Sequence, residues 1–174
     1  MKYKQKIDII IALLLILLGS IILISPLFNV SNIRTISIIV FAAYTILNVL
    51  HYILTYKSKD IEGIISGLAS LIALIASIFY KEFTPRILAM ILMTWVIVMS
   101  IAKLNKADYY HDRRDRMWKV RIFILALFIL TGILASVNLA YTSRVQIIVV
   151  GFFMLVHGIL ELFDPITKYL IAHS

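Results

Sequence analysis

Two pairs of polar side chains within apolar stretches of the sequence have a spacing that could support proton chemistry. His157 and Glu161 are four residues apart, so in a helix they share one face, where a carboxylate can orient and charge an imidazole. Asn48 and His51, three residues apart, form a comparable face in an earlier stretch. Lipid offers no hydrogen bonds, so polar groups within membrane-spanning stretches are the natural candidates for function. We predict that these residues form a polar, proton-responsive site inside the membrane, and that Lys103 belongs to it.

Structural roles compete with this interpretation. His51, Lys103 and Glu161 lie near the ends of their apolar stretches, where long or amphipathic side chains reach the headgroups and water at modest cost. Asn48 and His157 lie about one turn deeper, where a hydrogen bond across a helix interface is worth about 0.6 kcal/mol on average. Both alternatives remain open at this point.

The elements that would position these residues are six apolar stretches, each near the roughly 20 residues that cross about 30 Å of hydrocarbon. Hydrophobic residues make up 62% of the 174 residues and charged residues 15%, and the mean hydropathy is +1.00. The sequence therefore predicts an all-α integral membrane protein with one six-span domain over residues 1–174. The predicted spans are Ile7–Ser25, Ile33–Tyr56, Ile61–Tyr80, Arg86–Leu104, Val120–Val137 and Val145–Phe163.

Lys and Arg residues are distributed unevenly between the gaps that separate the spans. The gaps on the side of the N-terminus hold 13 of the 17 basic residues, and the opposite side holds only Arg34, Lys81, Arg86 and Arg144. The positive-inside rule then predicts that both termini are cytoplasmic, in the plasma (inner) membrane if the cell is bacterial.

An internal repeat appears when the second, fourth and sixth spans are aligned on Arg34, Arg86 and Arg144. Seventeen residues after these arginines lie His51, Lys103 and Glu161, about 25 Å along a helix axis. The alignment predicts three tandem helical hairpins over residues of about 7–56, 61–104 and 120–163. If the three even-numbered spans meet, the three ionisable residues would surround one cytoplasmic vestibule.

The chain resembles the HdeD-like family of small bacterial membrane proteins, which are built as tandem two-helix repeats. The resemblance rests on Leu18-Gly19-Ser20 leading to Pro26, on Thr131-Gly132-Ile133, on His157-Gly158-Ile159, and on six spans in about 170 residues. It implies a role in survival of acid stress, and it supplies no established catalytic residues.

Small residues predict close helix packing at two places. Gly63 and Gly67 form a GIISG segment in the third span, and Gly132 with Ser136 repeats the spacing in the fifth. These faces would pack within the monomer or, less favoured, between protomers of a homo-oligomer or against a membrane-protein partner.

A basic cytoplasmic loop is predicted over residues 103–121. Its cations would attract anionic lipid headgroups by roughly 1 kcal/mol per residue near the surface. Nucleic acid is not needed to explain the charge, because a loop that sets topology already does so. No metal site is expected, since arginines interleave with Asp108, His111, Asp112 and Asp115. The residues predicted to contact anionic lipid are Lys106, Arg113, Arg114, Arg116, Lys119 and Arg121.

Motifs for catalysis or cofactor binding are not recognisable in the sequence. It has no Cys, no glycine-rich phosphate loop, no paired metal-binding histidines with a nearby glutamate and no nucleophile-elbow serine. We therefore expect a non-enzymatic membrane protein without a cofactor, HdeD-like, that contributes to acid or envelope stress tolerance or scaffolds a membrane partner. The alternative is a small permease or channel for a solute, ion or proton, which should show facing polar groups at mid-membrane.

Overall fold

A computed structural model describes residues 3–28, 32–55, 61–80, 82–137 and 143–171, and nearly all of these residues are helical. Six helices are long and apolar enough to cross a membrane, which confirms the predicted all-helical membrane class. A short 3₁₀ turn, η1 (Ser25–Phe28), follows the first helix. The six helices are α1 (Tyr3–Ile24), α2 (Ile33–Thr55), α3 (Ile61–Phe79), α4 (Pro85–Asp112), α5 (Met117–Val137) and α6 (Ser143–Ile171).

Two helices extend well beyond the apolar stretches that the sequence marks. The apolar stretch within α4 ends at Leu104, whereas the helix continues to Asp112. In the same way, the apolar stretch within α6 ends at Phe163, whereas the helix continues to Ile171. The segment 103–121 is therefore not a loop, because only residues 113–116 lie outside helices. The prediction is wrong here because polar residues end a hydrophobic pattern without ending a helix. Charged side chains in these last turns, such as Lys106 and Asp164, pair with side chains of other helices inside the bundle.

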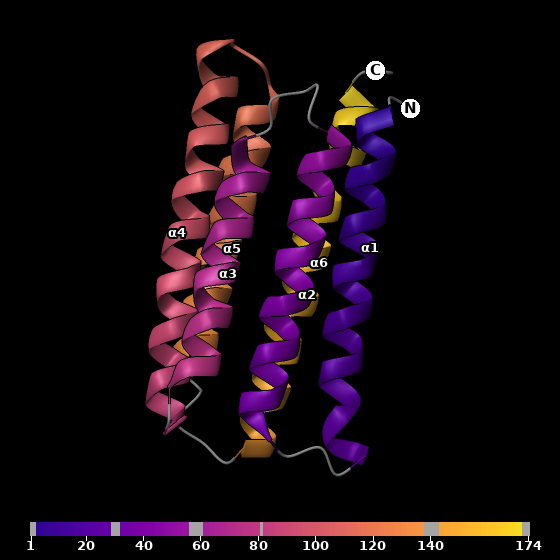
Figure 1. The fold of residues 1–174 in the computed structure, drawn as a ribbon. Coiled ribbons are helices and arrows are strands. Elements are labelled where there is room, and N and C mark those ends of the chain that lie inside the picture. The colour runs from indigo at the N-terminus through magenta and orange to yellow at the C-terminus, as the bar shows by residue number, and fades with distance from the viewer. Residues whose placement is uncertain (1–2, 29–31, 56–60, 81, 138–142, 172–174) are drawn as a thin grey trace.

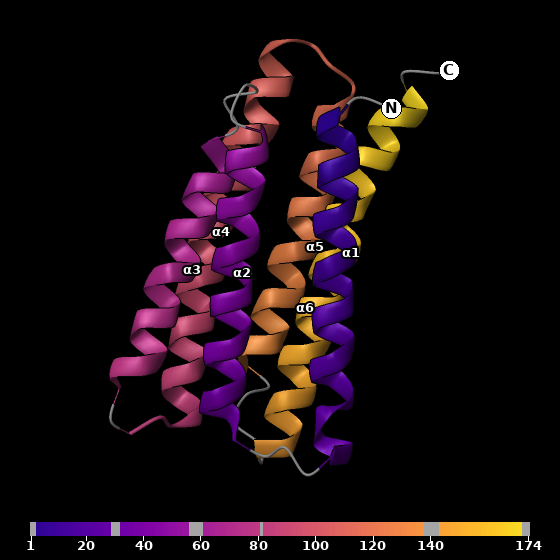
Figure 2. The same ribbon diagram turned by 45° about the vertical axis from the view of Figure 1, so that its right-hand side comes forward.

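The helices form a closed ring. Consecutive helices run in opposite directions, so the N-terminal and C-terminal ends lie at the same end of the bundle (Figure 1). Each helix contacts the next along the chain, and α1 also packs against α6, more extensively than any other pair (Figure 2). The next most extensive contacts join α4 to α5 and α2 to α3. The closest packing thus lies between the predicted hairpins and not within them, and the division into three tandem hairpins stays a prediction.

Glycines bring the backbones of α1 and α6 into direct contact. A Cβ atom built at Gly158 would lie 2.7 Å from the backbone nitrogen of Ile16, and one at Gly151 would lie 2.6 Å from that of Leu23. Gly19 on α1 is pressed in the same way against the backbone of α6. Only glycine fits at these positions without displacing a helix, so the three glycines set the distance between the first and last spans.

An aromatic cluster fills the middle of the bundle around Trp95 of α4. Its indole Nε1 donates a hydrogen bond to Ser70 Oγ of α3 at 2.9 Å, so the polar atom of this buried ring is satisfied. Rings from α2, α5 and α6 pack edge-on against it, with centroids 5.0 to 6.1 Å away: Phe41, Tyr44, Phe128 and Phe153.

Candidate functional site

Charged side chains gather inside the bundle at one end, which we call the charged end. Both termini lie at this end (Figure 1). They come from the first turn of α3, the last turns of α4, the first turns of α5 and the last third of α6. When all are ionised, three acidic and three basic groups balance one another. This charge cluster consists of Glu62, Glu161 and Asp164 with Lys103, Lys106 and Arg121.

Glu62 occupies the centre of the charge cluster. Its carboxylate accepts a hydrogen bond from Lys106 Nζ and lies 3.5 Å from Lys103 Nζ and 4.0 Å from a guanidinium nitrogen of Arg121. The position in the first turn of α3 also suits a negative charge, because the N-terminal end of a helix dipole is positive. One carboxylate therefore links α3 to both α4 and α5.

The other two carboxylates attach α6 to the same cations. Lys103 Nζ donates a hydrogen bond to Glu161 Oε1, and Arg121 Nη2 donates one to Asp164 Oδ2 at 2.5 Å. Pro165, inside α6, has no N–H to give to the carbonyl of Glu161. Each buried charge thus has a partner of opposite sign, which is the condition for holding charges away from water.

A small polar cavity lies beside the charge cluster, with a volume of about 50 Å³. This space is enough for several water molecules, and its carboxylate, amide and imidazole groups supply the polar partners that buried water needs. Tyr44 and Leu15, near the middles of their helices, are among its deepest lining residues. The polar lining residues are Asp8, Tyr44, Asn48, His51, Glu62, Ser66, Lys106, Glu161 and Asp164.

His51 pairs with Asp8 across the cavity wall. Its Nε2 lies 2.6 Å from Asp8 Oδ1, which joins α2 to α1. Both side chains are largely buried, with 15% and 20% of their surface exposed. His51 therefore does not reach toward headgroups, and the same holds for Lys103, whose ammonium points into the charge cluster.

His157 and Glu161 face one another but bond to different partners. The imidazole Nε2 of His157 lies 2.5 Å from the hydroxyl oxygen of Tyr44 and 3.9 Å from Glu161 Oε1, too far for a hydrogen bond. His157 is fully buried and is not part of the cavity lining, and its Nδ1 has no hydrogen-bond partner among the residues that the structure describes. Glu161 instead bonds to Lys103. Asn48 lines the cavity and donates its amide hydrogen bond to the backbone carbonyl of Tyr44 at 2.8 Å.

The glycines that the sequence marks for packing differ in how closely they are packed. A Cβ atom at Gly63 or Gly67 would meet α2 at 3.4 Å or more, which is ordinary contact. One at Gly132 would lie 2.7 Å from the side chain of Val96, so α4 and α5 approach closely there. Ser136 Oγ donates only to the carbonyl of Gly132 in its own helix.

The six residues predicted to contact anionic lipid fall into two groups. Lys106 and Arg121 point into the charge cluster, so their charge is already balanced by Glu62 and Asp164. This corrects their assignment to the surface, which missed carboxylates contributed by other helices. The other four are exposed around the turn between α4 and α5, and for them the lipid contact stays a prediction: Arg113, Arg114, Arg116 and Lys119.

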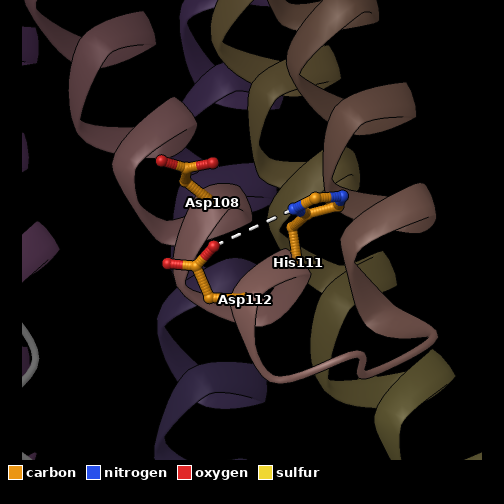
Figure 3. A group of neighbouring side chains, drawn as sticks. All are labelled: Asp108, His111 and Asp112. Carbon is orange, nitrogen blue, oxygen red and sulfur yellow. Dashed lines mark ion pairs between the residues drawn. The ribbon is translucent and has the colours of Figure 1, made fainter.

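Three side chains at the end of α4 bring possible metal ligands together (Figure 3). One ligand atom each from Asp108, His111 and Asp112 lies within 4.8 Å of the others, and His111 Nδ1 is 3.9 Å from Asp112 Oδ1. All three are exposed. Exposed groups at helical spacing come together without an ion, and Arg113 and Arg114 follow directly, so this geometry does not change the expectation that the chain has no metal site.

Three carboxylates of the charged end are not among the residues that the sequence predicted for the site. Glu62, Asp164 and Asp8 lie at the edges of apolar stretches, where they look like ordinary boundary residues. A useful signal was present, because eight of the nine acidic residues, all except Glu82, lie on the side that holds most of the basic residues. The hydrogen-bonding partners of Asp8, Glu62 and Asp164 are 43 or 44 positions away in the chain, which no local pattern could show.

Comparison with known proteins gives one match. A protein-family model described as "Short repeat of unknown function (DUF308)" matches residues 126–169, the second half of α5 and most of α6. This repeat defines HdeD-like membrane proteins, so the match agrees with the resemblance over the last predicted hairpin. Neither the curated proteins nor the solved structures compared with the chain gave a match.

Proposed function

We propose that this chain is a non-enzymatic, HdeD-like protein of the bacterial plasma membrane that supports survival of acid or envelope stress. The observation that carries the proposal is the cavity at the charged end, where the Asp8–His51 pair faces the charge cluster. Histidine is the side chain that changes charge between about pH 5 and 8. The Asp8–His51 pair joins α1 to α2 beside the buried charges of the other four helices, so a change at this pair would act on the charged end of the bundle.

The arrangement of polar groups favours this function over a permease. Polar and charged groups that face the cavity lie at the charged end, and the opposite end of the bundle, which we call the apolar end, is filled by buried aliphatic side chains such as Ile36, Val40, Leu88 and Ile147. A transporter needs binding groups at mid-membrane that both sides can reach. Here polar groups at mid-membrane bond to one another, Tyr44 to His157 and Trp95 to Ser70.

A survival assay tests the proposal. Cells that lack the gene would be complemented with the wild-type chain, with His51→Gln, or with His111→Gln as a control histidine on the surface. We expect loss of survival at low external pH without the gene, restoration by the wild type and by His111→Gln, and at least a tenfold poorer restoration by His51→Gln at equal expression. Equal restoration by both variants would refute the role given to His51.

Proton flux distinguishes the permease alternative. Purified protein reconstituted into vesicles loaded with a pH-sensitive dye should give no more flux under an imposed potential than vesicles without protein. A flux that the wild type supports and His51→Gln or Glu161→Gln abolishes would overturn the non-transport proposal.

The proposed orientation has its own test. The chain has no Cys, so a single introduced thiol can be labelled without background. We expect Asp112→Cys, at the charged end, to react with an impermeant reagent only after cells are opened, and Glu82→Cys, between α3 and α4, to react in intact cells. The reverse pattern would place the termini outside.

A further inference from the structure

An apolar groove runs along the outside of the bundle between α4 and α5, on a different face from the polar cavity. Its volume is about 430 Å³. Its one polar side chain, Ser100, donates its hydroxyl to the carbonyl of Val96 in its own helix at 2.7 Å. The groove therefore has no side-chain donor left for a polar ligand. It is lined by Met93, Val96, Ile97, Ser100, Ile101 and Leu104 of α4 and by Leu125, Ile129 and Ile133 of α5.

The length of the groove matches one leaflet of a bilayer. From Met93 to Leu104 the helix rises about 16 Å, roughly half of a hydrocarbon core of about 30 Å. An acyl chain of a lipid in the leaflet at the charged end has about this length, so the groove can hold one along its whole extent.

Beyond the lining of the groove, the next turns of α4, the turn that follows and the start of α5 carry exposed charges of both signs: two carboxylates on α4, and the cations Arg113, Arg114, Arg116 and Lys119. On α4, Ile97, Ile101 and Leu104 are followed on the same face by Asp108 and His111, since the spacing alternates between four and three residues. Asp112 adds a second carboxylate beside them (Figure 3). The imidazole of His111 contacts the ring of Trp118 on α5, with the ring centroids 5.1 Å apart. Lys119 Nζ, also on α5, lies 5.9 Å from the centroid of the Trp118 ring.

We propose that this groove binds phosphatidylethanolamine. One acyl chain would lie between α4 and α5, the primary ammonium would donate hydrogen bonds to Asp108 and Asp112, and the phosphate would lie toward Lys119. Choline carries no N–H, and the hydroxyls of the glycerol headgroup are uncharged donors, so of the three lipids phosphatidylethanolamine offers the charged N–H donor that suits the two carboxylates best. The proposal is independent of the proposed function, because it involves none of the residues of the cavity.

Native mass spectrometry of the purified full-length protein tests the proposal. The protein would be mixed with equal amounts of dioleoyl phosphatidylethanolamine, phosphatidylcholine and phosphatidylglycerol, which share the same chains. We expect phosphatidylethanolamine to be retained at least threefold more than either of the others. The double variant Asp108→Asn/Asp112→Asn should bring this ratio close to one, whereas the control Glu82→Gln, at the other end of α4, should leave it unchanged.

Variants of the groove test the acyl chain. Ser100→Phe fills the groove and should lower retention of all three lipids, as should Ile97→Trp, a half-exposed position that tolerates a larger side chain if Ser100→Phe fails to fold. Met90→Phe, an exposed position of α4 outside the groove, is the matched control. Equal retention of the three lipids by the wild type would overturn the proposal, and so would a preference that survives the double variant. Disulfide-linked dimers of Ile97→Cys in vesicles would assign the groove to a second copy instead.

Discussion

The charged end and the apolar end of this bundle are built from different interactions. At the charged end, six ionisable side chains from four helices pair around Glu62, and two more join α1 to α2. At the apolar end, the buried residues are mostly aliphatic, and hydroxyls such as Ser37 and Ser77 bond to carbonyls of their own helices. The charged end thus depends on particular partners, whereas the apolar end depends on shape, and a single substitution should affect the two ends very differently.

The largest effect is expected from the centre of the charge cluster. Glu62→Gln removes the carboxylate that Lys106 and Lys103 share and leaves buried cations without full compensation, at a cost of about 3–5 kcal/mol. Glu82→Gln, exposed near the apolar end, should cost close to nothing. Unfolding in mixed detergent, followed by circular dichroism, measures both. Equal stability of the two variants would mean that the charge cluster contributes nothing to the fold.

A smaller loss is expected where α1 and α6 touch. Gly158→Ala places a methyl group 2.7 Å from a backbone nitrogen of α1, and overpacking of this kind costs about 1–3 kcal/mol. Gly67→Ala is the control, because the nearest atom lies at 3.6 Å and alanine favours a helix over glycine by about 1 kcal/mol. The same unfolding assay should show Gly158→Ala less stable than the wild type and Gly67→Ala at least as stable. The opposite order would contradict the packing described for α1 and α6.

The hydrogen bond in the middle of the bundle should contribute less again. Ser70→Ala leaves the indole N–H of Trp95 without its acceptor, at a cost of about 1 kcal/mol, within the range found for hydrogen bonds in membranes. Ser100→Ala should be nearly neutral, because its hydroxyl bonds only to its own helix. A shift in the fluorescence of Trp95, measured in a Trp118→Phe background, would report the lost bond, and an unchanged spectrum would argue against it.

The smallest effect is expected at the rim of the apolar end. Arg34 donates hydrogen bonds to the carbonyls of Ser77, at 3.1 Å, and Ile78, in the last turn of α3, so Arg34→Gln should cost roughly 0.5 kcal/mol. Hydrogen exchange in that turn should become faster. Arg86→Gln, at the matching position of the repeat, should leave exchange there unchanged. Equal acceleration by both variants would mean that the two arginines act alike, as the repeat predicts. The hydrogen bonds from Arg34 to α3 would then not be what protects that turn from exchange.

The sequence predicted the apolar end better than the charged end. Hydropathy is a local property, so the start of α2 and the end of α5 were predicted to the residue and the other span boundaries at the apolar end to within two residues. Ion pairs are not local. The sequence marked Lys103 and Glu161 as notable but could not show that they pair, because 58 positions separate them.

The proton-responsive site itself stays a prediction, and the structure shows where its residues lie. Asn48, His51 and Glu161 do line one cavity, since all three lie near the same end of their helices. His157 lies outside the lining because its imidazole turns toward Tyr44, a choice of rotamer that spacing does not determine. The tight glycine contacts were missed for a related reason: Gly151 and Gly158 are seven residues apart, and only the path of α1 across that face shows that they act together.

The ring closure between α1 and α6 has a consequence for how the protein is made. Synthesis proceeds from the N-terminus, so the first helix enters the membrane while the helix that it packs against most extensively is still to be translated. Until α6 arrives, the face of α1 around Gly19 is exposed to lipid or to the insertion machinery, and the Asp8–His51 pair is a polar link that can hold α1 to α2 in the nascent chain. The first helix therefore gains its main packing contacts only when the last helix is inserted. A ribosome stalled before residue 143 would leave α1 without α6.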